Sequence, residues 1–301
     1  MKPISLAAFG IIPAVALALA LTVHGAAGQA TPSPDLRAEL GDDGGLTNCV
    51  DPSFPPMEYF ENQNSQEPIG FDIDLVSEIG KRLGVAVDEI PTEFTGLLPA
   101  LQSGRCDIIA SGLYLTAERL KTFDAQPYYD TSVILLTRSD NNEIHTPDDL
   151  AGKTVAVQSG TNYINILNDL QARLQADGKT PMTIQTYPKQ TDAIQQLVVG
   201  RAAATITQDT EAAFREIAQP GQFKIAYTYP DTQTFGIYYR PDASALEAAL
   251  KEAVEAMRDD GTLAKIAEKW NLPTAGAQYT GNIYGATPEA SPAAAEATPA
   301  S

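Results

Sequence analysis

Short apolar runs alternate along this chain with longer stretches in which apolar residues recur every three or four positions. The short runs predict buried strands, and the longer stretches predict helices with one apolar face. In the first half, the predicted elements are strands at 46–50, 87–90 and 107–110 and helices at 73–83 and 97–102. After Asp148 the order returns, with strands at 154–157, 182–186 and 203–207 and helices at 163–175 and 192–199. This repetition predicts an α/β protein with two lobes, each a parallel-rich sheet flanked by helices.

Two further apolar runs, 133–137 and 235–239, are expected to cross between the lobes as a two-strand hinge. The first lobe is then made of residues 45–136 and 235–275, and the second lobe of residues 137–234. Ligands of open α/β sheets bind outside the carboxyl ends of the strands. The site is therefore expected in the cleft between the lobes.

Residues 1–30 are predicted to be an export signal. Lys2 is the only charge before an apolar run at 4–23, and small residues follow up to Ala30. The alternative is an uncleaved anchor helix, because the run approaches the ~20 residues that a membrane span needs. No Cys adjoins the run, so the lipid attachment typical of a lipoprotein is not expected, and we expect a periplasmic or extracellular protein.

Residues 31–44 and 276–301 are expected to be a disordered linker and a disordered tail, because both are poor in large apolar residues. Acidic residues outnumber basic ones by 38 to 20, which gives a formal net charge of −18. Without a basic patch, nucleic acid is not an expected partner. His and Cys are not clustered, so neither a metal nor a cofactor is predicted.

One segment, residues 113–119, carries the clearest chemical signal. It follows a predicted strand and is expected to open a helix, with Thr116 as the N-cap and Arg119 in the first turn. A guanidinium beside unpaired helix N–H groups attracts a carboxylate. The alternative is an Arg on a solvated first turn.

The surrounding motifs resemble family 3 solute-binding proteins, the amino-acid-binding proteins of ABC importers. The similar blocks are residues 70–75 (Gly-Phe-Asp-Ile-Asp-Leu), 94–105, the Thr-x-Glu-Arg run at 116–119, 127–129, 261–266 and 269–270. They are colinear and span roughly 45–272. The resemblance implies a two-lobed periplasmic-binding-protein fold of type II and a monomer that delivers an amino acid to a membrane permease. It implies no enzyme activity.

The resemblance also implies roles for particular residues. Arg119 would bind the ligand carboxylate, assisted by the backbone near Ser111 and Gly112 and by the turn that contains Thr161 and Asn162. Asp209 would bind the ammonium, with a helix N-cap as the alternative. Asp51 would be a second polar contact, with an Asp-Pro turn as the alternative.

Side-chain recognition is assigned by the same resemblance to Phe54 and Phe94, for which plain core packing is the alternative. Gln158, Asn162 and Gln208 occupy positions that read the ligand side chain, and none is charged. We therefore expect a neutral polar, glutamine-like amino acid. The family that this chain resembles usually has Ser or Thr where this chain has Tyr114. Of all positions in the expected site, this departure bears most on which class of ligand is bound.

Cys49 and Cys106 each lie in a predicted strand, and the resemblance makes those strands neighbours. A disulfide and two buried free thiols both remain open. The alternative function is a periplasmic dehydratase of the cyclohexadienyl or arogenate type, which shares the fold. That reading lacks support from acid–base residues, since the chain has only His24 and His145 as histidines.

Overall fold

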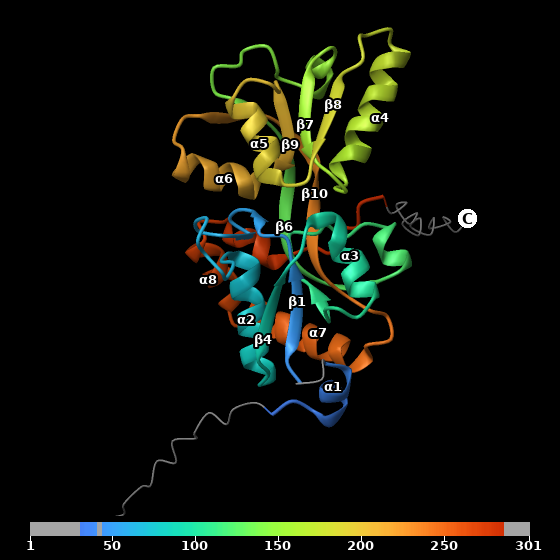
Figure 1. Ribbon diagram of the computed structural model, residues 1–301, viewed down its shortest axis with the longest axis vertical. Helices are drawn as coiled ribbons and strands as arrows, with labels where there is room; N and C mark the ends of the chain where they lie inside the picture. The colour runs from blue at the N-terminus through green and yellow to red at the C-terminus, as the bar shows by residue number, and fades with distance from the viewer. Residues whose placement is uncertain (1–30, 41–43, 286–301) are drawn as a thin grey trace, which may run out of the picture.

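Eight strands form one mixed sheet that runs the length of the molecule (Figure 1). The computed structural model describes residues 31–40 and 44–285. The strand order is β4-β1-β5-β10-β6-β9-β7-β8. In that order, the strands are Val87–Pro91, Leu46–Val50, Ile108–Ile109, Phe223–Tyr239, Asp124–Arg138, Ala204–Gln208, Thr154–Gln158 and Thr183–Tyr187. A separate hairpin consists of β2 (Ser53–Phe54) and β3 (Glu58–Tyr59).

Helices cover both ends of this sheet and divide the molecule into two lobes (Figure 1). In the first lobe they are α1 (Pro34–Glu39), α2 (Phe71–Leu83), α3 (Phe94–Gln102), α7 (Ser244–Asp259) and α8 (Thr262–Lys269). In the second lobe they are α4 (Tyr163–Ala176), α5 (Gln190–Val198) and α6 (Asp209–Ala218). Short 3₁₀ turns complete the fold at η1 (Arg119–Lys121), η2 (Pro147–Leu150) and η3 (Thr274–Gln278). The α/β class and the predicted order of strands and helices are confirmed.

Strands β6 and β10 join the lobes as long antiparallel partners, and both lobes share one sheet through them. Their pairing runs from Phe223–Arg138 to Tyr239–Asp124. Both strands are far longer than the apolar runs predicted, because their half-buried middle parts carry polar residues that the hydrophobic pattern omits. At the far end of this strand pair, inside the second lobe, the N–H of Ser139 donates to the carbonyl of Gln222 at 3.0 Å.

Two expectations of disorder are wrong for described residues. Helix α1 forms within the predicted linker, with the Ser33 hydroxyl accepting from the N–H of Leu36 at 3.1 Å. Glu39 then accepts two backbone hydrogen bonds at the start of α7, from Ala245 and Leu246. In the predicted tail, residues 279–285 lie along the crossing strands, as described below. Residues 286–301 lie outside the described residues, as does the predicted signal at 1–30.

The predicted helix after Thr116 is also wrong: the segment forms only the single 3₁₀ turn η1. Residues 113–116 are extended instead, because Leu115 donates to the carbonyl of Thr234 and Gly236 donates to the carbonyl of Leu113. The capping contact itself forms, since the N–H of Arg119 donates to Thr116 Oγ1 at 3.2 Å. Arg119 therefore lies just after an extended edge rather than in a helix.

A disulfide joins Cys49 in β1 to Cys106, with the two Cα atoms 5.7 Å apart. Cys106 precedes β5 rather than lying in it, and β1 and β5 are parallel neighbours. The bridge lies in an apolar cluster with Leu97, Leu101 and Ile109. It ties the segment that leads into β5 to β1, the strand that Asp51 follows.

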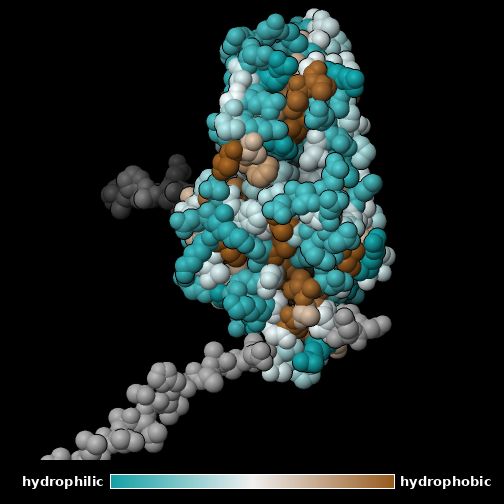
Figure 2. All heavy atoms as spheres, turned by 60° about the vertical axis from the view of Figure 1, so that its left-hand side comes forward, coloured by the Kyte–Doolittle hydropathy of each residue, from teal (hydrophilic) through white to brown (hydrophobic). Residues whose placement is uncertain are grey.

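The molecular surface is mainly hydrophilic on the face shown in Figure 2, where apolar residues appear in separate groups. The large apolar side chains that are exposed among the described residues are Val199, Ile217, Ile225 and Ile283. Within residues 31–40 and 44–285, no helix has the length and apolar character needed to cross a bilayer.

Candidate ligand-binding site

A cavity of about 390 Å³, counting the part open to solvent, lies between the lobes where the strands of both end. From the first lobe it is lined by Phe54, Glu58, Phe94, Ser111, Gly112, Tyr114 and Arg119. From the second lobe it is lined by Gln158, Thr161, Asn162, Tyr163, Gln190 and Gln208. Both lobes therefore supply side chains that a molecule held here would contact.

Arg119 is the one cationic side chain among the described residues that line this cavity. Its Nη1 donates to the carbonyl of Tyr114 at 2.9 Å, and its guanidinium lies 5.9 Å from the centre of the Phe94 ring. These two contacts hold the guanidinium plane and use one of its five N–H groups. The remaining donors suit a planar anion such as a carboxylate.

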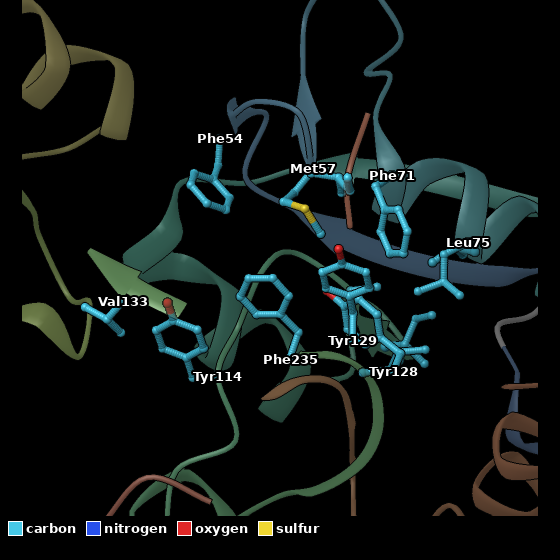
Figure 3. Packing of buried hydrophobic residues seen from close by; sticks show 14 of the residues in the cluster. Phe54, Met57, Phe71, Leu75, Tyr114, Tyr128, Tyr129, Val133 and Phe235 are labelled. Carbon is cyan, nitrogen blue, oxygen red and sulfur yellow. The ribbon is translucent and has the colours of Figure 1, made fainter. Parts of the chain in front are cut away.

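Tyr114 forms the wall next to Arg119 and reaches the second lobe. Its ring lies next to that of Phe235, as Figure 3 shows. The two rings are stacked, with centroids 5.3 Å apart and planes 9° apart. Its hydroxyl lies 3.2 Å from that of Tyr163, and burial raises the pKa of both phenols. Both rings are therefore neutral hydrogen-bonding groups. The Tyr114 ring therefore occupies space at this end of the cavity.

A buried acid pair supports the first-lobe side. Glu58 Oε1 accepts from the Ser111 hydroxyl at 2.9 Å, and Asp72 Oδ2 accepts from the N–H of Gly112 at 2.7 Å and from the Tyr128 hydroxyl at 2.9 Å. Burial and the neighbouring Asp72 charge raise the pKa of Glu58 well above its usual range. Burial also raises the pKa of Asp72 to about 6. Both carboxyl groups therefore bind a proton more tightly than they would in water.

Gly112 is required by both its conformation and its neighbours. Its φ of +53° is a left-handed value, and a Cβ there would lie 3.0 Å from the Phe54 ring. The close approach brings the backbone N–H of Gly112 onto Asp72 while Phe54 covers the cavity from the other side. A side chain at this position would displace the ring.

The lobes touch across the cleft at two further places. Gln158 Nε2 donates to Asp51 Oδ2 at 2.6 Å, and the rings of Tyr59 and Phe214 meet edge to face with centroids 5.3 Å apart. Burial raises the pKa of Asp51 to about 6, although the contacts with Gln158 and Ser53 oppose that shift. These contacts describe a closed arrangement of the lobes.

The turn after β7 supplies the second-lobe wall. Thr161 Oγ1 donates to the carbonyl of Gln158 at 2.8 Å, which closes the turn before α4. Gly160 has a φ of +78°, and a Cβ there would lie 2.9 Å from Thr95. The turn therefore packs directly on the first lobe.

Ten of the twelve residues predicted for the site line the cavity: Phe54, Phe94, Ser111, Gly112, Tyr114, Arg119, Gln158, Thr161, Asn162 and Gln208. Asp51 lies beside it through Gln158, and Asp51 also begins a tight turn by accepting from the N–H of Ser53. Asp209 does not line the cavity. It is the first residue of α6, not its N-cap, and its Oδ1 accepts from the Thr131 hydroxyl at 2.6 Å.

Three lining residues were not predicted for the site: Glu58, Tyr163 and Gln190. Gln190 is 1% exposed, and neither its Nε2 nor its Oε1 has a hydrogen-bond partner among the described residues. A Gln at the start of a helix carries no signal of its own in the sequence. Its importance comes from the fold, which turns the first residue of α5 toward the cleft.

No group of three or more His, Cys, Asp or Glu side chains within the described part of the chain is arranged to hold a metal ion. The cavity instead offers one guanidinium, one buried carboxyl group, several amides and four aromatic rings. That set suits an organic molecule with a carboxylate and hydrogen-bonding groups.

Comparison with known proteins gives a consistent result. Residues 46–273 match the model of bacterial extracellular solute-binding proteins, family 3. The L-cystine-binding protein TcyA of Bacillus subtilis (strain 168) is 28% identical over 78% of this chain and 84% of its own length. Structures of an ancestral arginine-binding protein bound to arginine and to glutamine are 32% and 31% identical, with TM-scores of 0.68 and 0.67. Each covers 75% of this chain and 97% of the solved chain.

Proposed function

Because the chain belongs to family 3 of the bacterial extracellular solute-binding proteins, we propose that it captures one neutral polar amino acid between its lobes. Like its relatives, the protein is an amino-acid-binding component of an ABC transporter and not an enzyme. The dehydratase alternative is therefore not retained. What remains to be argued is which groups of the ligand the cavity recognises.

Arg119 is proposed to bind the ligand carboxylate. Its guanidinium is fixed by the Tyr114 carbonyl and the Phe94 ring, while its other donors remain at the cavity. Binding a carboxylate with prepositioned donors costs little conformational entropy. A fork of N–H groups also favours a planar anion over a spherical one.

Gln190 is the observation that carries the proposal of a neutral polar side chain. Leaving both halves of a buried amide unpaired costs about 1–3 kcal/mol for each polar group. A ligand that both accepts and donates a hydrogen bond would remove that cost, and an aliphatic one would not. Gln158 and Gln208 line the same cavity and add further uncharged hydrogen-bonding groups.

A second ligand class, an amino acid with a cationic side chain, is favoured by Glu58. It is the one acid among the described lining residues, and the charges that act most on it, from Asp72 and Asp51, are both negative. A cation on the ligand would be attracted by these negative charges around Glu58. The structures of the ancestral relative bound to arginine and to glutamine represent the two classes.

The proposed cellular role is delivery of the captured amino acid to a membrane permease. Only the closed arrangement brings residues of both lobes to one ligand, so binding stabilises closure. The permease can then recognise the closed form. Export by a signal at residues 1–30, which lie outside the described residues, remains a prediction.

The test is a thermal-shift screen of protein that has been unfolded and refolded to remove any copurified ligand. Glutamine, cystine, arginine, histidine and glutamate should be compared at equal concentrations. A ligand at 100 times its dissociation constant adds roughly 2.7 kcal/mol of stability, or several degrees. Selective stabilisation by glutamine or cystine supports the proposal, whereas a response to arginine alone supports the cationic class. No response to any amino acid would contradict both.

A Gln190→Met variant gives a second, independent test. Removing an unpaired buried amide should raise the unfolding temperature of the ligand-free protein while weakening ligand binding. Gln195→Met, on an exposed position of the same helix, should change neither. A Gln190→Met protein with unchanged affinity would show that Gln190 does not read the ligand.

A further inference from the structure

Residues 280–285, named here the C-terminal strap, lie beyond the part of the chain that matches the family model. The strap runs along the crossing strands at the waist of the molecule, where Figure 1 shows the last described stretch in red. The N–H of Thr280 donates to Asp130 Oδ2 at 2.9 Å, and the N–H of Asn282 donates to Thr234 Oγ1 at 2.9 Å. Asn282 Nδ2 also donates to the carbonyl of Thr232 at 3.2 Å. The strap is thus fixed to β6 and β10 by side chains as well as backbone.

The end of the strap pairs with the segment that carries the ligand-facing residues. The N–H of Tyr284 donates to the carbonyl of Leu115, and the N–H of Ala117 donates to the carbonyl of Tyr284, both at 2.9 Å. On its other edge, Leu115 donates to the carbonyl of Thr234 in β10. The segment is therefore held on both edges, as an internal strand is. Tyr114 lies within it, and Arg119 lies two residues past its last paired position.

The side chain of Tyr284 faces the second lobe, since Tyr284 lines one hollow together with Asn162 and Asn165. Burial raises the pKa of its phenol, the Asp169 charge adds to that rise, and the Asn162 amide opposes it. Asp169 and Asn162 both belong to the region of α4. Tyr284 is therefore hydrogen-bonded to the first lobe through its backbone, while its side chain faces the start of α4 across a shared hollow.

The Tyr284 side chain lies beside residues that two hollows share. Arg119, Thr161 and Asn162 line the inner cavity, and the same three residues line an outer hollow that also contains Tyr284. A ligand that leaves the inner cavity on this side passes between Arg119 and Asn162, with Tyr284 at the edge of that passage.

From this arrangement we propose that Tyr284 is a positioning residue of the ligand gate. It holds the Tyr114–Arg119 segment against β10 and faces Asn162 across the outer hollow, so that the closed cleft opens slowly. The inference relies on the proposed function only in requiring that an amino acid binds in the inner cavity. The strap would then set the rate of ligand release rather than the identity of the ligand.

The test compares ligand release by stopped-flow fluorescence in four full-length proteins: wild type, Tyr284→Ala, Tyr284→Phe and Ile283→Ala. Tyr284→Ala should release ligand about tenfold faster with a similar association rate, because contacts of the closed state are lost. Tyr284→Phe, which keeps the ring and loses the hydroxyl, should be intermediate. Ile283→Ala alters an exposed neighbour, 41% accessible, and should behave as wild type. The unfolding temperatures without ligand should agree within about 2 °C.

Two truncations provide a readout that needs no ligand. Removing residues 280–301 should speed amide hydrogen exchange at Ala117, because its acceptor in Tyr284 is lost. Removing residues 291–301 alone should leave that exchange unchanged. Equal exchange at Ala117 in both truncated proteins, or wild-type release rates in Tyr284→Ala, would overturn the inference. Faster release in Ile283→Ala to the same extent would also overturn it, since the effect would then be general. If no amino acid binds at all, the proposed function fails while the exchange measurement still tests the strap.

Discussion

Gln158 of the second lobe donates a hydrogen bond of 2.6 Å to Asp51 of the first lobe, and thereby links the ends of β7 and β1 across the cleft. Asp51 is 3% exposed and also accepts from Ser53. The contact joins two positions that sequence analysis assigned to one site. Protonation of Asp51 in this contact is therefore expected to affect the free energy of unfolding.

Asp51 should make the protein less stable as the pH rises from about 4 to about 6. Its pKa is about 6 in the folded protein, mainly because of burial, against 3.8 as the reference value. The folded state binds the proton more tightly, so stability is lost between these values and then levels off. The free energy of unfolding relative to Asp51→Asn should fall by up to roughly 3 kcal/mol over this window. Chemical denaturation of both proteins at several pH values measures it, and parallel curves would contradict the assignment.

Arg119→Ala should weaken amino-acid binding by at least about 30-fold, because the ligand carboxylate would lose a charged and prepositioned partner. Arg119→Lys should recover only part of the affinity, since an ammonium lacks the planar fork. Isothermal titration calorimetry checks both. Arg105→Ala, which removes an exposed guanidinium from the same lobe, is the matched control. Normal affinity in Arg119→Ala would remove the carboxylate contact from the proposal.

Tyr114 should determine whether Asp209 contributes to binding. The Asp209 charge acts on the Tyr114 phenol, but Asp209 itself is bonded to Thr131 and does not line the cavity. Asp209→Asn should therefore weaken binding only slightly in the wild-type background. In a Tyr114→Ser background, where the ring no longer fills this end, the same change should weaken binding strongly. A double-mutant cycle measures the coupling. Equal effects in both backgrounds would show that Tyr114 does not separate Asp209 from the ligand.

Loss of the Cys49–Cys106 disulfide should destabilise the protein without abolishing ligand binding. The two residues are 57 positions apart, and a closed loop of that length corresponds to roughly 4 kcal/mol in the chain-entropy model. A protein of this size should then unfold at a temperature lower by roughly 10 °C. Thermal unfolding of Cys49→Ala/Cys106→Ala, compared with wild type before and after reduction, provides the measurement. If reduction destabilises the double variant equally, the effect does not come from this bridge.

Much of the fold could be predicted from hydrophobic patterning because most strands and helices are regular and buried. The pattern failed where tertiary pairing decides the local structure. Thr116 with Glu118 and Arg119 reads as a helix start, but the preceding residues are held extended by β10 and by the C-terminal strap. No local signal in the sequence reveals two partners more than 100 positions away.

The candidate site shows the same division. Arg119 and Gln158 follow strands and could be assigned from motifs, whereas Gln190 and Glu58 are placed by contacts that no spacing encodes. Glu58 lies in a hairpin of two short strands, and its environment comes from α2 and the end of β5. The composition of the strap predicts disorder, because the strap has few apolar residues. In the structure, hydrogen bonds to side chains of β6 and β10 offset that lack.

Ser139 and Gln222 are neighbours, joined by a hydrogen bond, although β7, β8, β9, α4, α5 and α6 of the second lobe lie between them in the sequence. A chain segment whose two ends meet is a natural unit for transplantation. This segment could be exchanged for the corresponding segment of a relative, with the first lobe left continuous. Alternatively, circular permutation could place the new chain ends within the segment. A chimaera of this kind would keep Arg119 and receive new residues in place of Gln158 and Gln190. Ligand selectivity and anchoring of the carboxylate would then be separable by design, one in each half of the molecule.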